Sequence, residues 1–250
     1  MDDFAKNLIA ATHKEGIGSV YERFRLQELF AVLAEKYKIE TVFEYDDCYT
    51  RGYENKAFLD RGKAVTVFSR RGLGRWPWSG KSPSFVREEP DGKFDLVWNF
   101  ALLPRENNFL DRLARFSGKY ILFFCPNYLN WGTPFHEAYH LLSQTECRHA
   151  ERGSIIDRIA PLLALRLKRR KFKILKRGYV DAPWWPDTGA SLAEVKKNIL
   201  GMKPKKKDSR GKTKVDFNRI YQKAQPSVFE SSSWSVFKPV LAHHFYFLLE

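Results

Sequence analysis

From Ser19 onward, segments with apolar residues at helical spacing alternate with short apolar runs. In Ser19–Lys38 the side chains of Phe24, Leu29 and Leu33 recur on one helical face with charges between them, which predicts an amphipathic helix. The apolar runs that follow are short, and such runs are typical of buried strands. The expected strands are Ile39–Tyr45, Lys63–Arg70, Phe94–Phe100, Lys119–Pro126, Phe172–Val180 and a last one within Pro239–Glu250.

Helices are expected between these runs. Gly118 is expected to end one of them, and Pro161 to start or interrupt another. Ser191 stands three residues before Glu194, which is the spacing of a capping box. Residues 71–84 are rich in glycine, proline and tryptophan and are expected as a loop. The helical segments are Arg51–Gly62, Glu106–Ser117, Pro134–Leu142, Gly153–Arg170 and Ser191–Leu200.

This alternation predicts an α/β fold in which helices cover both faces of a mostly parallel sheet. We expect a single domain over residues 1–250. Residues 1–38 form its helical lead-in, and residues 181–235 an insertion before the last strand. The linker-like stretch 201–214 belongs to that insertion.

Composition places the chain among globular proteins that need no cross-link. A domain of 250 residues buries roughly 70–75% of its unfolded surface, so neither a disulfide nor a metal is required for folding. The three cysteines form no C-x-x-C pair, which indicates a reducing, cytoplasmic location. The N-terminus is a poor signal peptide. No window approaches 18 apolar residues, so no membrane span is expected.

The net charge of +14 is concentrated in two basic runs, Arg166–Arg177 and Lys203–Lys214. One interpretation is contact with phosphates, as in nucleic acid. The other is a solvated helix end together with a charged loop. Basicity alone indicates no particular chemistry, and both interpretations stay open here.

The string HEAYH places His136, Glu137 and His140 at the spacing of an H-E-x-x-H motif. In a zinc peptidase the two histidines bind the metal and the glutamate is the general base. The pattern is short and arises by chance in unrelated chains. Two alternatives are histidines that line a substrate pocket and histidines with a structural role on a half-buried helix. We expect no metal, and we take His136 and His140 as candidate catalytic residues.

Several stretches resemble class I S-adenosylmethionine-dependent methyltransferases, in particular divergent, archaeal-looking members of the type 11-like group. The resemblance covers roughly Ser19–Glu250. Its clearest parts are similar to the first, fourth and fifth strands of that family and to the segments after its sixth strand and in its seventh. These parts read IETVFEY, FDLVWNFALLP, LARFSGKYILFFCPN, GYVDAPWWPDT and AHHFYFLL.

The resemblance implies a doubly wound, mostly parallel seven-stranded sheet with an antiparallel last strand, and S-adenosylmethionine as cofactor. The cofactor would lie at the carboxyl ends of the strands. Two groups of residues follow from this alignment. Those implied for the cofactor are Glu44, Asp46, Gly52, Ser69, Asn99 and Phe100, and those for the methyl acceptor are Asn127, Tyr128 and Trp131.

The sequence departs from the family pattern at two places. The loop after Glu44 keeps only Gly52 of the usual glycine-rich turn, so its backbone must follow another path. The second expected strand ends in Ser69 where the family has an acid for the ribose hydroxyls. Losing one charge-assisted hydrogen bond costs about 1.5–3 kcal/mol.

The expected function is therefore methyl transfer from S-adenosylmethionine to an unknown acceptor. One alternative is a non-catalytic module of the same fold that binds RNA or a protein partner. The third is a zinc hydrolase that uses the H-E-x-x-H string.

Overall fold

The computed structural model describes residues 1–13, 16–45, 52–69, 76–100, 108–143, 155–183, 215–230 and 236–250. Within these ranges it contains one seven-stranded sheet in the order β3-β2-β1-β4-β5-β7-β6. Only β7 runs antiparallel to its neighbours β5 and β6. The strands in that spatial order are Ser84–Val86, Ala64–Phe68, Thr41–Tyr45, Phe94–Asn99, Ser117–Pro126, His244–Leu249 and Ile174–Val180. The predicted fold class is confirmed.

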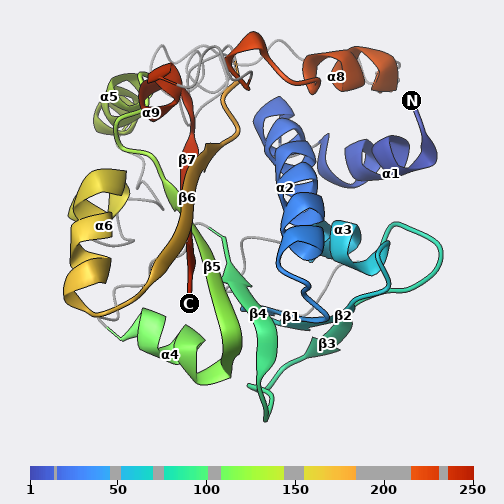
Figure 1. The fold of residues 1–250 in the computed structure, drawn as a ribbon. Helices are drawn as coiled ribbons and strands as arrows, with labels where there is room; N and C mark the ends of the chain where they lie inside the picture. Colours follow the sequence, from blue (N-terminus) through green and yellow to red (C-terminus); the bar gives the residue numbers. More distant parts are fainter. Residues whose placement is uncertain are drawn as a thin grey trace.

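Helices cover both faces of this sheet (Figure 1). On one face lie α2 (Ile17–Lys36) and α3 (Lys56–Leu59), and on the other α4 (Phe109–Phe116) and α6 (Ala160–Arg169). The helix α1 (Asp3–Thr12) packs against α2 and α8 (Phe217–Lys223). Around the ends of the strands lie α5 (Thr133–Ser143) and α9 (Lys238–Leu241). Short 3-10 turns are η2 (Tyr53–Asn55), η3 (Ile155–Arg158) and η4 (Val228–Glu230).

Each face of the sheet has its own apolar core. Phe30 of α2 is fully buried against three rings, those of Phe58 (5.0 Å between centroids), Trp98 (4.8 Å) and Phe124 (6.1 Å). The opposite core is formed by the apolar faces of α4 and α6 with the other side of the same strands. Because the central strands β1, β4, β5 and β7 are buried on both faces, their sequences are largely apolar.

Most expected elements are present, with shifts at their ends. The strand β5 begins at Ser117 because that residue already pairs with Phe94 of β4. Gly118 therefore lies inside the strand, and the expectation that it ends a helix was wrong. The helix expected over Arg51–Gly62 is a 3-10 turn and one α-turn. No strand was expected at β3, which begins at Ser84, the last residue of the expected loop. The expected helix 191–200 and most of the insertion 181–235 lie outside the described residues.

The parallel strands β1, β2, β4, β5 and β6 all end at the same side of the sheet, which we call the carboxyl edge. The antiparallel β7 begins there, since its first residue His244 pairs with both Pro126 and Val180. In open α/β sheets ligands bind outside this edge. None of the helices in the described ranges has the length and apolarity needed to cross a bilayer.

Candidate functional site

The end of β1 is fixed by a chain of buried polar contacts. The Nδ2 group of Asn55 donates to the Glu44 carboxylate, and its Oδ1 accepts from the Trp98 indole N–H at 2.9 Å. All three side chains are buried. The contacts join β1, η2 and β4, so the first described residues after Tyr45 are held against the carboxyl edge.

Gly52 is the first described residue after that loop, and its conformation explains why it is glycine. Its φ is +74°, in the left-handed region. A Cβ atom built there would lie 3.2 Å from a ring carbon of Phe85 and 3.4 Å from Val67. The glycine therefore allows the backbone to pass close to β2 and β3.

Asn99 ends β4 with one half of its amide engaged. Its Nδ2 group donates to the Tyr45 carbonyl. Its Oδ1 atom is buried and has no hydrogen-bond partner within the described ranges. A buried acceptor without a donor is rare and points to a missing partner. Two strands away, Ser69 is buried directly after β2, where its backbone N–H donates to the Val86 carbonyl at 3.1 Å.

Phe100 follows Asn99 and connects the strand ends to a second group of polar residues. Its buried ring lies 5.3 Å from the ring of Phe124 and 4.9 Å from that of His244. These contacts place an aromatic surface between the end of β4 and the start of β7.

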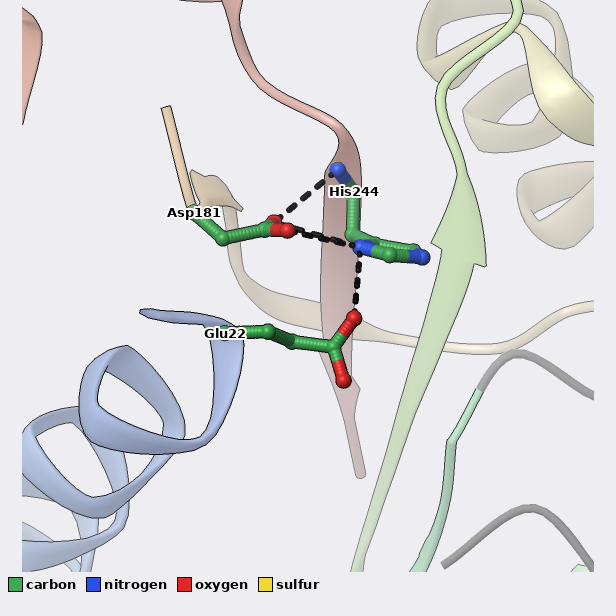
Figure 2. A group of neighbouring side chains, drawn as sticks. All are labelled: Glu22, Asp181 and His244. Carbon is green, nitrogen blue, oxygen red and sulfur yellow. Dashed lines mark hydrogen bonds and ion pairs between the residues drawn. The ribbon is translucent and has the colours of Figure 1, made fainter. Parts of the chain in front are cut away.

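Figure 2 shows that second group, Glu22, Asp181 and His244. The Nδ1 atom of His244 lies 3.0 Å from Oδ2 of Asp181 and 3.6 Å from Oε2 of Glu22. The three residues are buried and come from α2, from the residue after β6, and from the first position of β7. Two carboxyl groups thus lie close to one imidazole at the carboxyl edge.

Backbone contacts fix Asp181 in this arrangement. Its φ of +53° is in the left-handed region, which aspartate tolerates better than most residues. Its carbonyl accepts from the His243 N–H at 3.1 Å, and its Oδ1 accepts from the His244 N–H at 3.1 Å. The pairing of β6 with β7 therefore positions the carboxylate beside the ring.

Burial dominates the ionisation of Glu22. It raises the pKa of this carboxyl from an ordinary 4.5 to about 8, although His244 and Arg23 lower it and Asp181 and Glu54 raise it further. At neutral pH Glu22 is mostly protonated, and Asp181 is the main counter-charge available to His244.

The residues expected to border a methyl acceptor lie in the turn after β5. The Asn127 side chain donates to the carbonyls of Pro239 (2.8 Å) and Ala242 (2.9 Å). Its backbone N–H donates to the His243 carbonyl at 2.7 Å. Asn127 therefore holds the backbone that leads into His244. Its role toward an acceptor stays a prediction.

Two further residues of that turn are oriented by backbone contacts. Tyr128 N–H donates to the Arg158 carbonyl, and Trp131 N–H donates to that of Val240. The Trp131 side chain is 41% exposed. Together these contacts tie the turn to η3 and α9. The predicted roles of Tyr128 and Trp131 toward an acceptor also stay predictions.

The helix expected for the H-E-x-x-H string is confirmed as α5. The side chains of His136, Glu137 and His140 lie outside the described residues, as does Asp46 in the loop after β1. Their predicted roles are not tested by this structure.

Sequence reasoning missed Glu22, Asp181 and His244. Two signals in the chain could have found them. One is the His-His pair at the start of an otherwise aromatic strand, and the other is an aspartate directly after the preceding strand. A polar residue where a buried strand begins is informative because burial demands a partner.

A basic groove lies at the far end of the sheet, between α6 and the edge strand β6. Its volume is about 500 Å³. Part of the run 166–177 is paired, since Arg166 contacts Asp157 and Arg170 contacts Asp111. Lys173 of the same run contacts Glu250. The groove has no acid among its lining residues, which are Pro161, Ala164, Leu165, Lys168, Ile174, Leu175, Lys176 and Arg177.

No protein-family model matches the sequence. No curated protein matches it either.

Among solved structures, similar ones include three methyltransferases. A magnesium protoporphyrin IX methyltransferase from Synechocystis PCC 6803 with bound SAH is 12% identical, covers 67% of this chain and 80% of its own, and has a TM-score of 0.47. A plantazolicin methyltransferase in complex with a triazolic desmethylPZN analog and SAH is 12% identical. The match covers 99% of this chain and 97% of that protein, with a TM-score of 0.45. A SAM dependent methyltransferase from Archaeoglobus fulgidus is 11% identical. The match covers 89% of this chain and 93% of that protein, with a TM-score of 0.42.

The chain has the class I methyltransferase fold. All three TM-scores lie below 0.5, so this assignment rests on the strand order and on the reversed direction of β7.

Proposed function

We propose that this protein is an S-adenosylmethionine-dependent methyltransferase. The observation that carries the proposal is the buried Oδ1 atom of Asn99, an acceptor without a donor in the described part of the chain, at the carboxyl end of β4. An amino or hydroxyl group of the cofactor would supply that donor. The atom lies at the edge where ligands of such sheets bind.

The other residues at this edge fit parts of the same cofactor. The Glu44 carboxylate suits an amino group, and the Phe100 ring suits an apolar or aromatic part. Ser69 would reach a ribose hydroxyl, with one hydrogen bond and no charge. Asp46, directly after β1, and Gly52, directly before η2, would border the cofactor.

When bound, the cofactor supplies a methyl group already activated on a sulfonium. The protein then has to align the acceptor with that methyl and exclude water. Candidates for the acceptor side are His136, His140, Asn127, Tyr128 and Trp131. These residues do not specify one chemical class of acceptor.

Isothermal titration calorimetry of the full chain with S-adenosylhomocysteine tests the proposal. We expect the wild type to bind. Asn99→Ala should weaken binding about two- to tenfold, since one hydrogen bond is worth about 0.5–1.5 kcal/mol. Ser69→Asp restores the acid of the family pattern and should tighten binding about tenfold or more.

The exposed variant Val32→Ala (52% exposed) serves as the control and should bind like the wild type. Folded wild-type protein that gives no heat at millimolar ligand would overturn the proposal.

A second candidate function is RNA binding at the basic groove. The cations Lys168 of α6 and Arg177 of β6 border it over an apolar floor, whereas the Lys176 ammonium lies over the Tyr246 ring, 6.0 Å from its centroid. This would suit a phosphate backbone with bases packed against the floor. It does not exclude methyl transfer at the carboxyl edge.

Fluorescence anisotropy with a labelled single-stranded RNA tests it. Binding should weaken steeply as salt rises from about 50 to about 200 mM, and each charge removed by Lys168→Gln or Arg177→Gln should reduce the salt slope by about one. Lys6→Gln on α1 makes the same charge change away from the groove and should leave the slope nearly unchanged. Equal effects of all three substitutions would contradict a role for the groove.

A further inference from the structure

His244 has one ring nitrogen engaged and one that points away from its partners. Nδ1 lies between the carboxyl groups of Asp181 and Glu22, whereas Nε2 is directed away from both (Figure 2). Within the described ranges, Nε2 forms no hydrogen bond or ion pair. It does not belong to the fully enclosed polar atoms without a partner. The ring therefore presents one free nitrogen.

The contact with Asp181 selects the tautomer. A carboxylate 3.0 Å from Nδ1 accepts a hydrogen bond from that nitrogen, so the neutral ring carries its hydrogen on Nδ1 and a lone pair on Nε2. Asp181 cannot rotate away easily, because its Oδ1 also accepts from the His244 backbone N–H. The orientation of the imidazole is thus fixed by the backbone.

The position of the ring connects it to the proposed site. It lies 4.9 Å from the ring of Phe100, which directly follows β4. It also lies at the end of β5, opposite Pro126 and next to the turn that Asn127 begins. A group between these elements would be close to both the cofactor edge and Nε2.

We propose that Nε2 of His244 is the general base that accepts a proton from the methyl acceptor, and that Asp181 is its positioning residue. This inference rests on the proposed methyltransferase function. It defines the acceptor class as a neutral hydroxyl or amine, whose oxygen or nitrogen carries a proton that must leave. A thioether or a preformed anion would need no base.

The proton and the methyl group move in opposite directions at the acceptor atom X. The X–H proton moves to Nε2, and the electron pair of that bond stays on X. The same atom X forms the bond to the methyl carbon, while the pair of the broken S–C bond goes to sulfur. The resulting imidazolium then releases its proton to water.

The charges around the ring suit this role. The groups facing it are Glu22 from α2 and Asp181 after β6, and His243 lies 3.6 Å from the same aspartate. Behind Glu22, Arg23 and Glu54 form an ion pair of 3.2 Å. With Glu22 protonated at neutral pH, the imidazolium and Asp181 form a neutral pair, so the charged ring is stabilised without a second uncompensated carboxylate.

A divalent cation is the competing interpretation, since the three ligand atoms lie within 4.8 Å of one another. The hydrogen bonds favour the base. Asp181 already accepts from both Nδ1 and the backbone N–H of His244, and a metal would have to displace the Nδ1 proton. The metal is therefore an outcome that the test must separate.

Two measurements on the full chain, neither of which needs the acceptor, test the proposal. Two-dimensional ¹H–¹⁵N NMR of the imidazoles should show the proton of His244 on Nδ1. Carbethoxylation by diethyl pyrocarbonate, located by peptide mass spectrometry, should modify Nε2 of His244, and saturating S-adenosylhomocysteine should slow that reaction.

Two variants distinguish a positioning role of Asp181 from a purely structural one. Asp181→Asn can donate to Nδ1 and move the ring proton to Nε2, so the reaction of His244 should slow by at least about tenfold. Glu22→Gln keeps Asp181 and should change the rate by less than about threefold. If Asp181→Asn does not fold, the wild-type tautomer alone decides.

A proton on Nε2, or no reaction at His244, would overturn the inference. So would stoichiometric binding of added Zn²⁺ that His244→Gln abolishes, because that identifies a metal site. If calorimetry shows no binding of S-adenosylhomocysteine while the tautomer and reactivity are as expected, the proposed function fails on its own.

Discussion

Glu22 is a carboxyl group enclosed in protein, and its ionisation is coupled to folding. Its pKa is about 8 when folded and near 4.5 when exposed. Between these values the folded state holds a proton that the unfolded state has lost, so the contribution of Glu22 to stability is greatest below pH 4.5 and is lost as pH rises through 8.

Glu22→Gln should remove this dependence. The free energy of unfolding of the variant relative to the wild type should rise with pH between about 5 and 8, by at most about 1.4 kcal/mol per pH unit. Urea unfolding at several pH values across this range measures it. A difference that stays constant would show that Glu22 ionises normally.

Two glycines with nearly the same φ angle allow the cost of backbone strain to be measured separately from the cost of side-chain crowding. Gly52 has φ +74°, and a Cβ added to it would lie 3.2 Å from a ring carbon of Phe85, whereas Gly62 has φ +73° and open space. Both alanine variants should lose about 1–2 kcal/mol from the left-handed backbone. Gly52→Ala should lose more, as measured by urea unfolding. Equal losses would mean that Phe85 moves aside without cost.

Strand ends were the most predictable part of the site. Glu44, Ser69, Asn99 and Phe100 could be placed at one edge from sequence, because parallel strands end on the same side. Asp181 and His244 could not, since they are 63 residues apart and only the pairing of β6 with β7 joins them. Local periodicity contains no information on such a contact.

At the level of elements, Phe30 is the largest of the α2 side chains that pack into the core on that face of the sheet. Phe30 contacts rings on α3, β4 and β5. Phe30→Ala should lower the free energy of unfolding by about 3–5 kcal/mol through the cavity it leaves. The exposed Val32→Ala on the same helix should change it by less than about 0.5 kcal/mol. Chemical denaturation measures both, and similar values for the two would contradict this packing.

The elements that sequence reasoning misplaced are short or contain conflicting signals. The strand β3 has three residues, too few for a period to be seen. Gly118 indicates a helix end by its type, but pairing with β4 recruits Ser117 and the residues after it into β5. The segment before β7 contains a proline that α9 accepts in its first turn, so the last strand is shorter than its apolar run.

At the scale of the whole molecule, one sheet joins the carboxyl edge to both helical layers. A ligand that binds only the folded chain therefore stabilises all of it. S-adenosylhomocysteine at about a hundredfold over its Kd should add about 2.7 kcal/mol. That corresponds to a rise in Tm of roughly 5–10 °C for a chain of this length.

Differential scanning calorimetry measures this rise, with methionine as the control compound, which should leave Tm nearly unchanged. An identical Tm with and without S-adenosylhomocysteine would contradict a site at this edge.

The position of β7 has a consequence for how the molecule is made. It follows the other six strands of the described residues along the chain, yet it lies between β5 and β6. During translation β6 therefore has no neighbour in the sheet until residues 244–249 have left the ribosome, and its open edge is exposed to association with other chains. Because β7 begins with His244, its insertion completes the sheet and at the same time brings the His244 imidazole to the carboxyl edge.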